Sequence, residues 1–67
     1  MTTYKVINVV GESDKSFSDA VQNAVDEAAK TVDNICYAEI ERFTTKIKDD
    51  NVGLFRAEVK LSFEVEN

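Results

Sequence analysis

Residues 55–65 read Phe-Arg-Ala-Glu-Val-Lys-Leu-Ser-Phe-Glu-Val, an unbroken alternation of apolar and polar side chains. Successive side chains of a β-strand point to opposite faces, so this period of two predicts a strand with one apolar face and one polar face. The apolar face must be buried against another part of the chain, and the remaining sequence indicates which element packs on it.

The preceding segment, residues 35–48, alternates in the same way and predicts a second long strand. One face carries Cys36, Ala38 and Ile40, and the other carries Tyr37, Glu39 and Glu41. We expect the first face to cover a helix, with Cys36 as a small core residue.

The composition of residues 49–53, Asp-Asp-Asn-Val-Gly, predicts a turn between the two strands. Because both strands exceed the usual length of ~5 to 6 residues, their hairpin is expected to project beyond the helix and to expose apolar side chains.

The helix is predicted from Phe17 to Val32, where apolar residues, mostly alanine and valine, recur every three or four positions. Ser16 followed by Asp19 has the spacing of a capping box, which satisfies free N–H groups at a helix start. Asp33 and Asn34 then end the helix, because Asn tolerates the left-handed backbone conformation.

Upstream of the helix, residues 4–10 are rich in β-branched side chains and predict a first strand that ends in a turn at Gly11, with a loop over residues 12–15. The element order is therefore β-α-β-β. A right-handed crossover between strands 1 and 2 leaves a slot for strand 3 between them, antiparallel to both. The prediction is an α+β fold, a sheet of order 1-3-2 wrapped around one helix, as a single domain over residues 1–67.

A chain of 67 residues buries only ~60 % of the surface that its unfolded form exposes, so its core is marginal. Small proteins usually add disulfides, a metal or self-association. With one cysteine and no histidine, the chain allows neither an internal disulfide nor a zinc site. Self-association is the remaining route to stability, so further copies of the chain are the expected partner.

The net charge of −5 repels polyphosphate backbones, and nucleic acid is not an expected partner. No apolar run approaches the ~20 residues of a membrane span, and the first residues lack the pattern of a secretory signal. We therefore expect no membrane partner and a cytoplasmic location.

The polar face of the two long strands carries the candidate binding residues. It presents one aromatic ring, Tyr37, among charged residues that include Glu39, Arg56 and Glu58. A tyrosine ring can stack on a flat ligand, and a guanidinium can donate hydrogen bonds to its carbonyl edge. The alternative is that these side chains form solvated cross-strand pairs or a subunit contact.

Neither catalysis nor a dedicated metal loop is indicated by the sequence. It has no histidine, no nucleophile beside a base and no phosphate-binding loop, so no catalytic residue is predicted and the chain is not expected to be an enzyme. Carboxylates repeated around a symmetry axis could bind a hard cation such as calcium through oxygen ligands, but no metal ligand is assigned.

Five segments of the chain together resemble the dodecins. They are Tyr4-Lys5-Val6-Ile7, Gly11-Glu12-Ser13, the run from Ser16 to Val25, Thr31-Val32-Asp33-Asn34-Ile35 and Val59-Lys60-Leu61-Ser62-Phe63. Their order, spacing and total length cover essentially the whole chain. The resemblance implies a hollow homododecamer that holds flavin (riboflavin, FMN or FAD) between subunits for storage and protection.

The resemblance also implies the positions that would touch the flavin. In flavin-binding members a tryptophan stacks on the isoalloxazine ring and a glutamine contacts its polar edge, and the matching positions here are Tyr37 and Arg56. The candidate site is Tyr37, Arg56, Glu39 and Thr44. At Thr44, and at Glu64, bacterial members often carry arginine near the ligand phosphate. Arg56 is expected either to contact the ring edge or to pair with Glu39 or Glu58 and close the pocket. Some dodecin-like proteins with arginine at this place are associated with calcium, which is the alternative to flavin.

Overall fold

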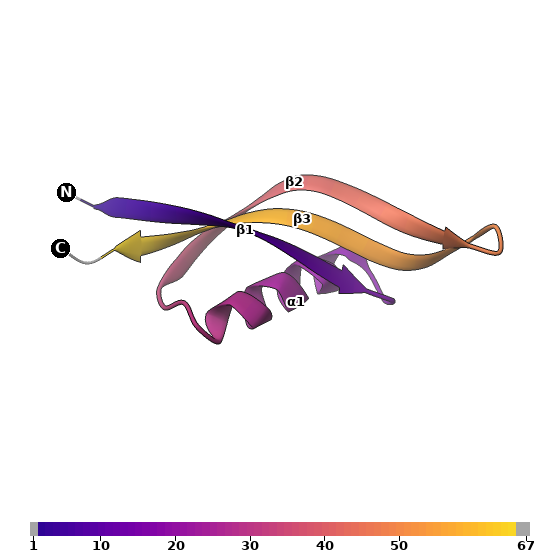
Figure 1. Ribbon diagram of the computed structural model, residues 1–67, viewed down its shortest axis with the longest axis horizontal. Helices are drawn as coiled ribbons and strands as arrows, with labels where there is room; N and C mark the ends of the chain where they lie inside the picture. The colour runs from indigo at the N-terminus through magenta and orange to yellow at the C-terminus, as the bar shows by residue number, and fades with distance from the viewer. Residues whose placement is uncertain (1, 66–67) are drawn as a thin grey trace.

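Three strands and one helix make up the computed structural model, which describes residues 2–65. In chain order they are β1 (Thr3–Ser13), α1 (Phe17–Ala29), β2 (Ile35–Lys48) and β3 (Asn51–Val65). β1 and β2 both pair antiparallel with β3 in one sheet of order β1-β3-β2 (Figure 1). The predicted β-α-β-β order and the central place of the third strand are confirmed.

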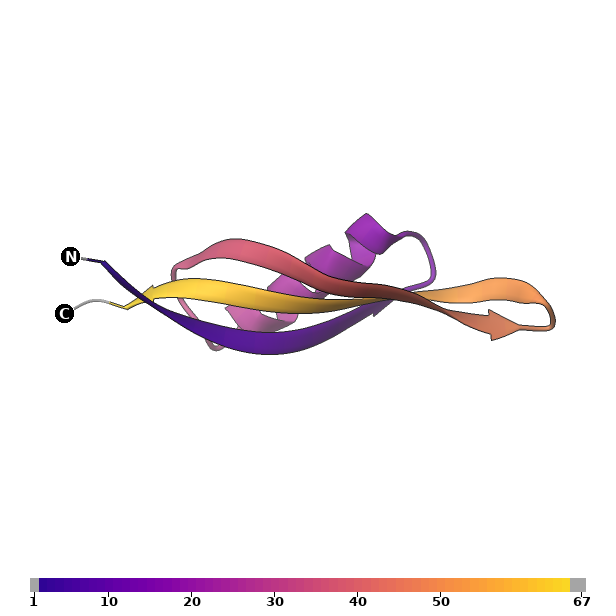
Figure 2. The same ribbon diagram turned by 90° about the horizontal axis from the view of Figure 1, so that it is seen from above.

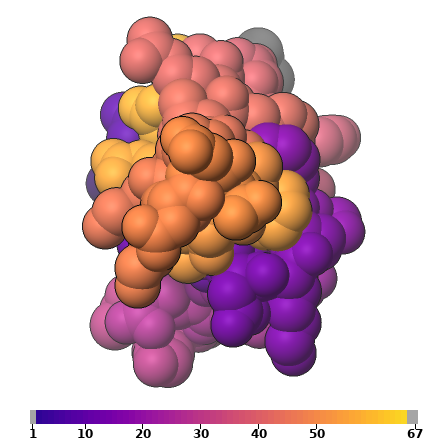
Figure 3. Space-filling view, turned by 90° about the vertical axis from the view of Figure 1, so that its right-hand side faces the viewer, coloured from indigo at the N-terminus to yellow at the C-terminus, as the bar shows by residue number. Residues whose placement is uncertain are grey.

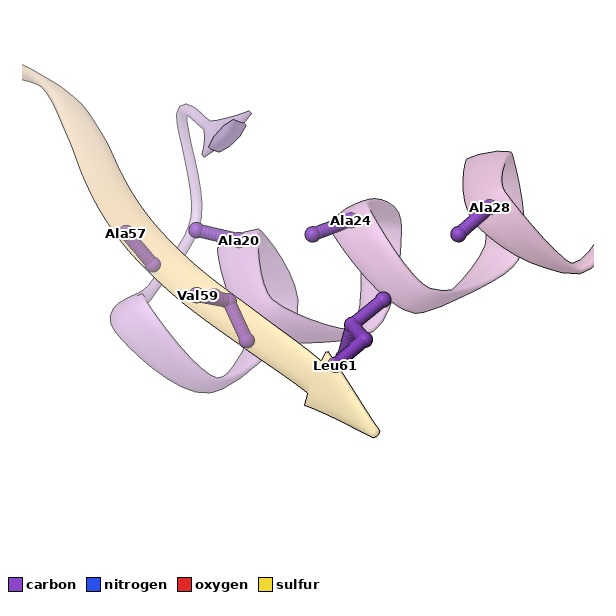
Figure 4. Packing of buried hydrophobic residues seen from close by; sticks show 6 residues of the cluster. All are labelled: Ala20, Ala24, Ala28, Ala57, Val59 and Leu61. Atoms are coloured by element: carbon purple, nitrogen blue, oxygen red, sulfur yellow. The ribbon is translucent and has the colours of Figure 1, made fainter. Parts of the chain in front are cut away.

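The core lies between α1 and the face of β3 that the alternation predicted. Figure 4 shows Ala20, Ala24 and Ala28 of α1 facing Ala57, Val59 and Leu61 of β3, and all six are buried. α1 packs over β1 and β3 and leaves β2 largely uncovered, so Ile40 and Phe43 of β2 remain exposed. The expectation that β2 covers the helix therefore holds only in part.

β1 is longer than predicted, because Gly11 lies within the strand and does not end it. Its pairing with β3 continues through Glu12 to Ser13. A Cβ atom at Gly11 would overlap the carbonyl oxygen of Ala20 and would lie 2.9 Å from both the backbone nitrogen and the Cβ of Ala24. The glycine is required for the close approach of the helix, and the prediction of a turn there was wrong.

The helix begins as predicted and ends earlier. Ser16 has an extended backbone, and its Oγ accepts a hydrogen bond of 3.0 Å from the Asp19 N–H, as expected for an N-cap. α1 ends at Ala29, three residues before the predicted Val32, whose N–H still donates to the Ala28 carbonyl at 2.9 Å. The chain must leave the helix there to bring Ile35 opposite Phe63. Asn34 adopts the predicted left-handed conformation, with φ of 62°.

The turn between β2 and β3 contains two residues and not the predicted five. Asp49 and Asp50 have φ of 51° and 63°, the two positive values that a type I′ hairpin turn requires. Gly53 therefore lies within β3. The β2–β3 hairpin extends past α1, as predicted (Figures 1 and 2), and it stands in front of the helix in the end-on view of Figure 3. Ile47 and Val52, paired near its tip, are more than half exposed.

β2 is irregular, and this corrects the placement of Cys36. The β2–β3 register shifts between Ile35 and Tyr37, between Ile40 and Arg42, and between Lys46 and Ile47. Cys36 lies in the first of these shifts, is exposed and donates from Sγ to the Asn34 carbonyl at 3.2 Å. It is not the core residue that simple alternation predicted.

The chain is elongated for its length. Its Cα radius of gyration is 13.6 Å, whereas a compact domain of this length has about 11 Å, and its extents are 51 × 20 × 13 Å. Within residues 2–65, α1 is the only helix, and it is too short and too polar to cross a bilayer.

Candidate ligand-binding face

The candidate residues lie on the side of the sheet that faces away from α1, which we call the outer face. Residues opposite each other on antiparallel strands share a face, and those that alternate with the buried residues of β3 lie on the outer one. By register these are Tyr4, Val6, Asn8, Val10 and Glu12 of β1, Tyr37, Glu39, Arg42 and Thr44 of β2, and Arg56, Glu58, Lys60, Ser62 and Glu64 of β3.

At the end of the sheet near the termini, the outer face carries two tyrosines. Tyr37 lies opposite Ser62, and Tyr4 lies opposite the next outer residue of β3, Glu64. Their ring centroids are 6.0 Å apart with an interplanar angle of 66°, an edge-to-face arrangement. Tyr37 is 65 % exposed and Tyr4 is 44 % exposed. Desolvation raises the pKa of the Tyr4 phenol, and negative charge on Tyr37, Cys36 and Glu64 raises it further.

Arg56 lies at the other end of the outer face, between Thr44 of β2 and Glu12 of β1. Its Nη1 atom is 3.6 Å from Glu12 Oε2, and both side chains are about half exposed. Of the two alternatives for Arg56, pairing with Glu39 or Glu58 is not what one chain shows within residues 2–65, because Arg56 pairs with Glu12 and Glu58 lies 3.6 Å from Arg42 Nε. Glu12 was not predicted as the partner of Arg56, because residues 12–15 were expected to form a loop, whereas β1 continues through Glu12.

Tyr37 and Arg56 do not meet within one chain. Their β3 positions, Ser62 and Arg56, are six residues apart, which corresponds to about 20 Å along a strand. A single flat three-ring ligand does not span that distance. Of the four candidate residues, the structure brings only Thr44 and Arg56 together as cross-strand neighbours.

Glu39 belongs to a charged group in the middle of the outer face. It lies opposite Lys60, whose Nζ atom is 2.8 Å from Glu41 Oε1. The hydrogen bond and the charge of Glu41 raise the pKa of Lys60, and the charge of Glu39 adds to the effect. Beside this group lies an open groove of about 330 Å³, lined by side chains that include Asn8, Val10, Glu41, Arg42 and Glu58.

Across residues 2–65 of one chain, no three or more carboxylate or cysteine side chains come close enough to share a metal ion.

Comparison with known proteins identifies the family. The dodecin family model matches residues 3–66. Among solved structures, a dodecin from Streptomyces coelicolor is 33 % identical with a TM-score of 0.92, and the alignment covers 98 % of this chain and 94 % of that one. A protein from Thermus thermophilus has a TM-score of 0.95 at 24 % identity, with 100 % and 98 % covered, and supports the fold. A calcium dodecin from Mycobacterium tuberculosis, described as calcium-chelating, is 28 % identical with a TM-score of 0.82, with 96 % and 91 % covered. A search of curated proteins gave no match. The family model and the Streptomyces coelicolor match together show that the chain belongs to the dodecin family.

Proposed function

We propose that copies of this chain assemble and bind flavin (riboflavin, FMN or FAD) between them, with the isoalloxazine ring against Tyr37 and its polar edge near Arg56. One observation supports this most strongly. The position of the family's stacking tryptophan is occupied by an aromatic ring that is 65 % exposed on the outer face. A tyrosine offers a smaller stacking surface than a tryptophan, so we expect binding that is weaker than with tryptophan.

The large solvent-exposed surface of one copy, and the apolar side chains on it, support the assembly of several copies. The chain exposes 4975 Å², whereas a compact monomer of this size exposes about 4,200 Å². Exposed apolar side chains lie on the outer face at Val6 and Val10 and at the hairpin tip at Ile47 and Val52. We propose that these surfaces are covered in the homododecamer that family membership implies.

The flavin site needs residues from more than one copy. Because Tyr37 and Arg56 are about 20 Å apart in one chain, a ligand that touches both must take one of them from a neighbouring copy. Thr44 lies beside Arg56, and Glu39 lies two residues from Tyr37. We therefore expect Thr44 to act with Arg56, and Glu39 with Tyr37, on opposite sides of the subunit contact.

The proposed role is sequestration and not catalysis. Stacking holds the ring without supplying a nucleophile or a proton-transfer group. The contacts of Tyr37 with Tyr4 and of Arg56 with Glu12 are an aromatic contact and an ion pair. A net charge of −5 disfavours nucleic acid as a partner, and we propose a cytoplasmic store of flavin.

A flavin-free, cation-binding assembly is the second candidate, and the Arg56–Glu12 pair favours it. The guanidinium expected at the flavin edge is already 3.6 Å from a carboxylate. In this alternative the pair closes the pocket, and carboxylates from several copies hold a hard cation such as calcium. The similarity to a calcium dodecin supports the same candidate.

Titration with riboflavin separates the two candidates. Flavin fluorescence is followed while purified protein is added, with and without a calcium chelator. Flavin binding predicts quenching at micromolar protein that is lost in Tyr37→Ala and largely retained in Tyr37→Phe, because the phenyl ring keeps most of the stacking surface. Glu12→Gln should strengthen quenching, since it releases Arg56.

Absence of riboflavin quenching would support the cation-binding candidate under one further condition. If the parent protein gives no quenching, and calcium instead raises its melting temperature, the flavin proposal is wrong and the cation candidate is supported. In that case a Tyr37→Trp, Arg56→Gln double variant should gain quenching if the Arg56–Glu12 pair is what closes the pocket.

A further inference from the structure

We infer that Tyr4 is a positioning residue for Tyr37 and thereby sets how tightly the flavin ring is held. This inference rests on the proposed function, but it concerns a residue of β1 that neither the sequence pattern nor the family's tryptophan position singled out. Tyr4 and Tyr37 lie on β1 and β2, the two outer strands of the sheet (Figure 1), and their ring centroids are 6.0 Å apart.

The register of the sheet explains why these two rings touch. Tyr37 lies opposite Ser62, and Tyr4 lies opposite Glu64, so each is a diagonal neighbour of the other across the central strand. Ser62 has a small side chain and leaves space above the strand. β1 and β2 are not paired with each other, but the two long side chains reach across Ser62 far enough for their rings to touch. The centroid distance of 6.0 Å and the angle of 66° give the edge-to-face contact that aromatic quadrupoles favour.

Among residues 2–65, Tyr4 is the only aromatic side chain in contact with the Tyr37 ring. It follows the register shift after Ile35, lies on an edge strand and is 65 % exposed. The other aromatic contacts, of Phe17 with Phe43 and Phe55, belong to a cluster of three rings at the start of α1. An exposed ring without a partner samples several rotamers, and a ligand that stacks on it must supply the cost of ordering it. Contact with Tyr4 lowers that cost before the ligand arrives.

The raised pKa of Tyr4 is consistent with its contact with Tyr37. Desolvation raises the pKa of the Tyr4 phenol, and the nearby groups that raise it further come from both neighbouring strands: Tyr37 and Cys36 of β2, and Glu64 of β3. Tyr37 is 65 % exposed beside Tyr4, so the contact between the two rings leaves surface of Tyr37 free for a ligand.

The binding test compares Tyr4→Leu with Tyr4→Phe. Aromatic pairs contribute enough beyond burial to change an affinity about 2- to 12-fold, so Tyr4→Leu should raise the Kd for riboflavin within that range. Tyr4→Phe should restore the parent Kd, because it keeps the ring and removes only the hydroxyl. Thr3→Ala, which changes the exposed neighbour of Tyr4 on the opposite face of β1, is the matched control and should leave the Kd unchanged.

A double-variant cycle decides whether Tyr4 acts through Tyr37. In a Tyr37→Leu background, Tyr4→Leu should cause no further loss of affinity. An equal loss in both backgrounds would overturn the inference, since Tyr4 would then affect the ligand or the assembly independently. An unchanged Kd in Tyr4→Leu would overturn it as well.

A second measurement needs no flavin, so its failure is separate from failure of the proposed function. The chain has two tyrosines and no tryptophan, so its phenolate absorbance and its tyrosine circular dichroism come from this pair alone. In Tyr37→Phe the pKa of Tyr4 should fall toward its ordinary value, because one of the charges that raise it is gone. If the parent binds no flavin, the proposed function is wrong, and this titration alone decides whether Tyr4 holds Tyr37. A Tyr4 pKa that does not change in Tyr37→Phe refutes the pairing.

Discussion

Replacing Gly11 by alanine tests the main packing contact of the fold. In the structure a Cβ atom at this position overlaps the carbonyl oxygen of Ala20 and lies 2.9 Å from two atoms of Ala24. Ordinary contacts of a Cβ atom begin near 3.4 Å, so α1 must retreat by about half an ångström at Ala24 and by more at Ala20. The obstacle is helix backbone, which cannot rotate away as a side chain does.

The loss of folding free energy in Gly11→Ala depends on how much of the core packing requires the close contact of α1 with β1. The helix contributes three alanines to the core, and a gap of ~0.5 to 1 Å already removes a quarter to a half of each dispersion contact. Overpacking of this kind typically costs about 1 to 3 kcal/mol. A domain of 67 residues has a total stability of ~3 to 10 kcal/mol, so Gly11→Ala should remove a large fraction of it.

The chain contains its own control. Gly53 has no positive φ, and an added Cβ there would meet Lys48 Cβ at 3.4 Å and Lys46 O at 3.7 Å, both ordinary contacts. Gly53→Ala should therefore be neutral or should stabilise the protein by up to ~1 kcal/mol. Urea unfolding followed by circular dichroism, at one protein concentration because self-association shifts the midpoint, gives the comparison. If Gly11→Ala unfolds at the same urea concentration as Gly53→Ala, α1 is not held against β1 in the way described.

Two further predictions use the same unfolding assay. Ser16→Ala removes the acceptor for the Asp19 N–H and should cost about 1 kcal/mol, whereas the nearby Ser18→Ala should change stability by less than ~0.5 kcal/mol, and equal losses would argue against the cap. The folded state raises the pKa of Tyr4 and Lys60 above their ordinary values of 10.0 and 10.5, so the stability that these groups supply is present below those values and is lost as the pH rises through the folded pKa values. Unfolding midpoints should therefore fall as the pH rises above about 10, and Lys60→Gln should make the fall shallower.

The sequence predicts the architecture well because its strongest signals are local. The alternation from Phe55 to Val65 identified the core face of β3, and the capping box at Ser16 located the start of α1. Gly11 shows where this reasoning fails. A glycine after a β-branched run is typical of a turn, and only the position of Ala20 and Ala24 in space reveals that the glycine serves a close helix–strand contact.

The candidate site was less predictable, because it depends on register. The shifts in β2 place Cys36 at the surface, and a strict period of two cannot anticipate them. The Arg56–Glu12 pair depends on β1 continuing past Gly11, so it was missed with that strand extension. Tyr4 could have been found, since it precedes Val6 at the spacing of one strand face, but its contact with Tyr37 crosses a third strand that lies between them.

The sheet order also governs how the protein is made. β1 and β2 pair only with β3, and β3 is the last of the three strands to be translated. A nascent chain therefore holds two unmatched strands and a helix with no finished surface beneath it until β3 has left the ribosome. Sheet formation, and any meeting of subunits that depends on it, must follow the synthesis of β3.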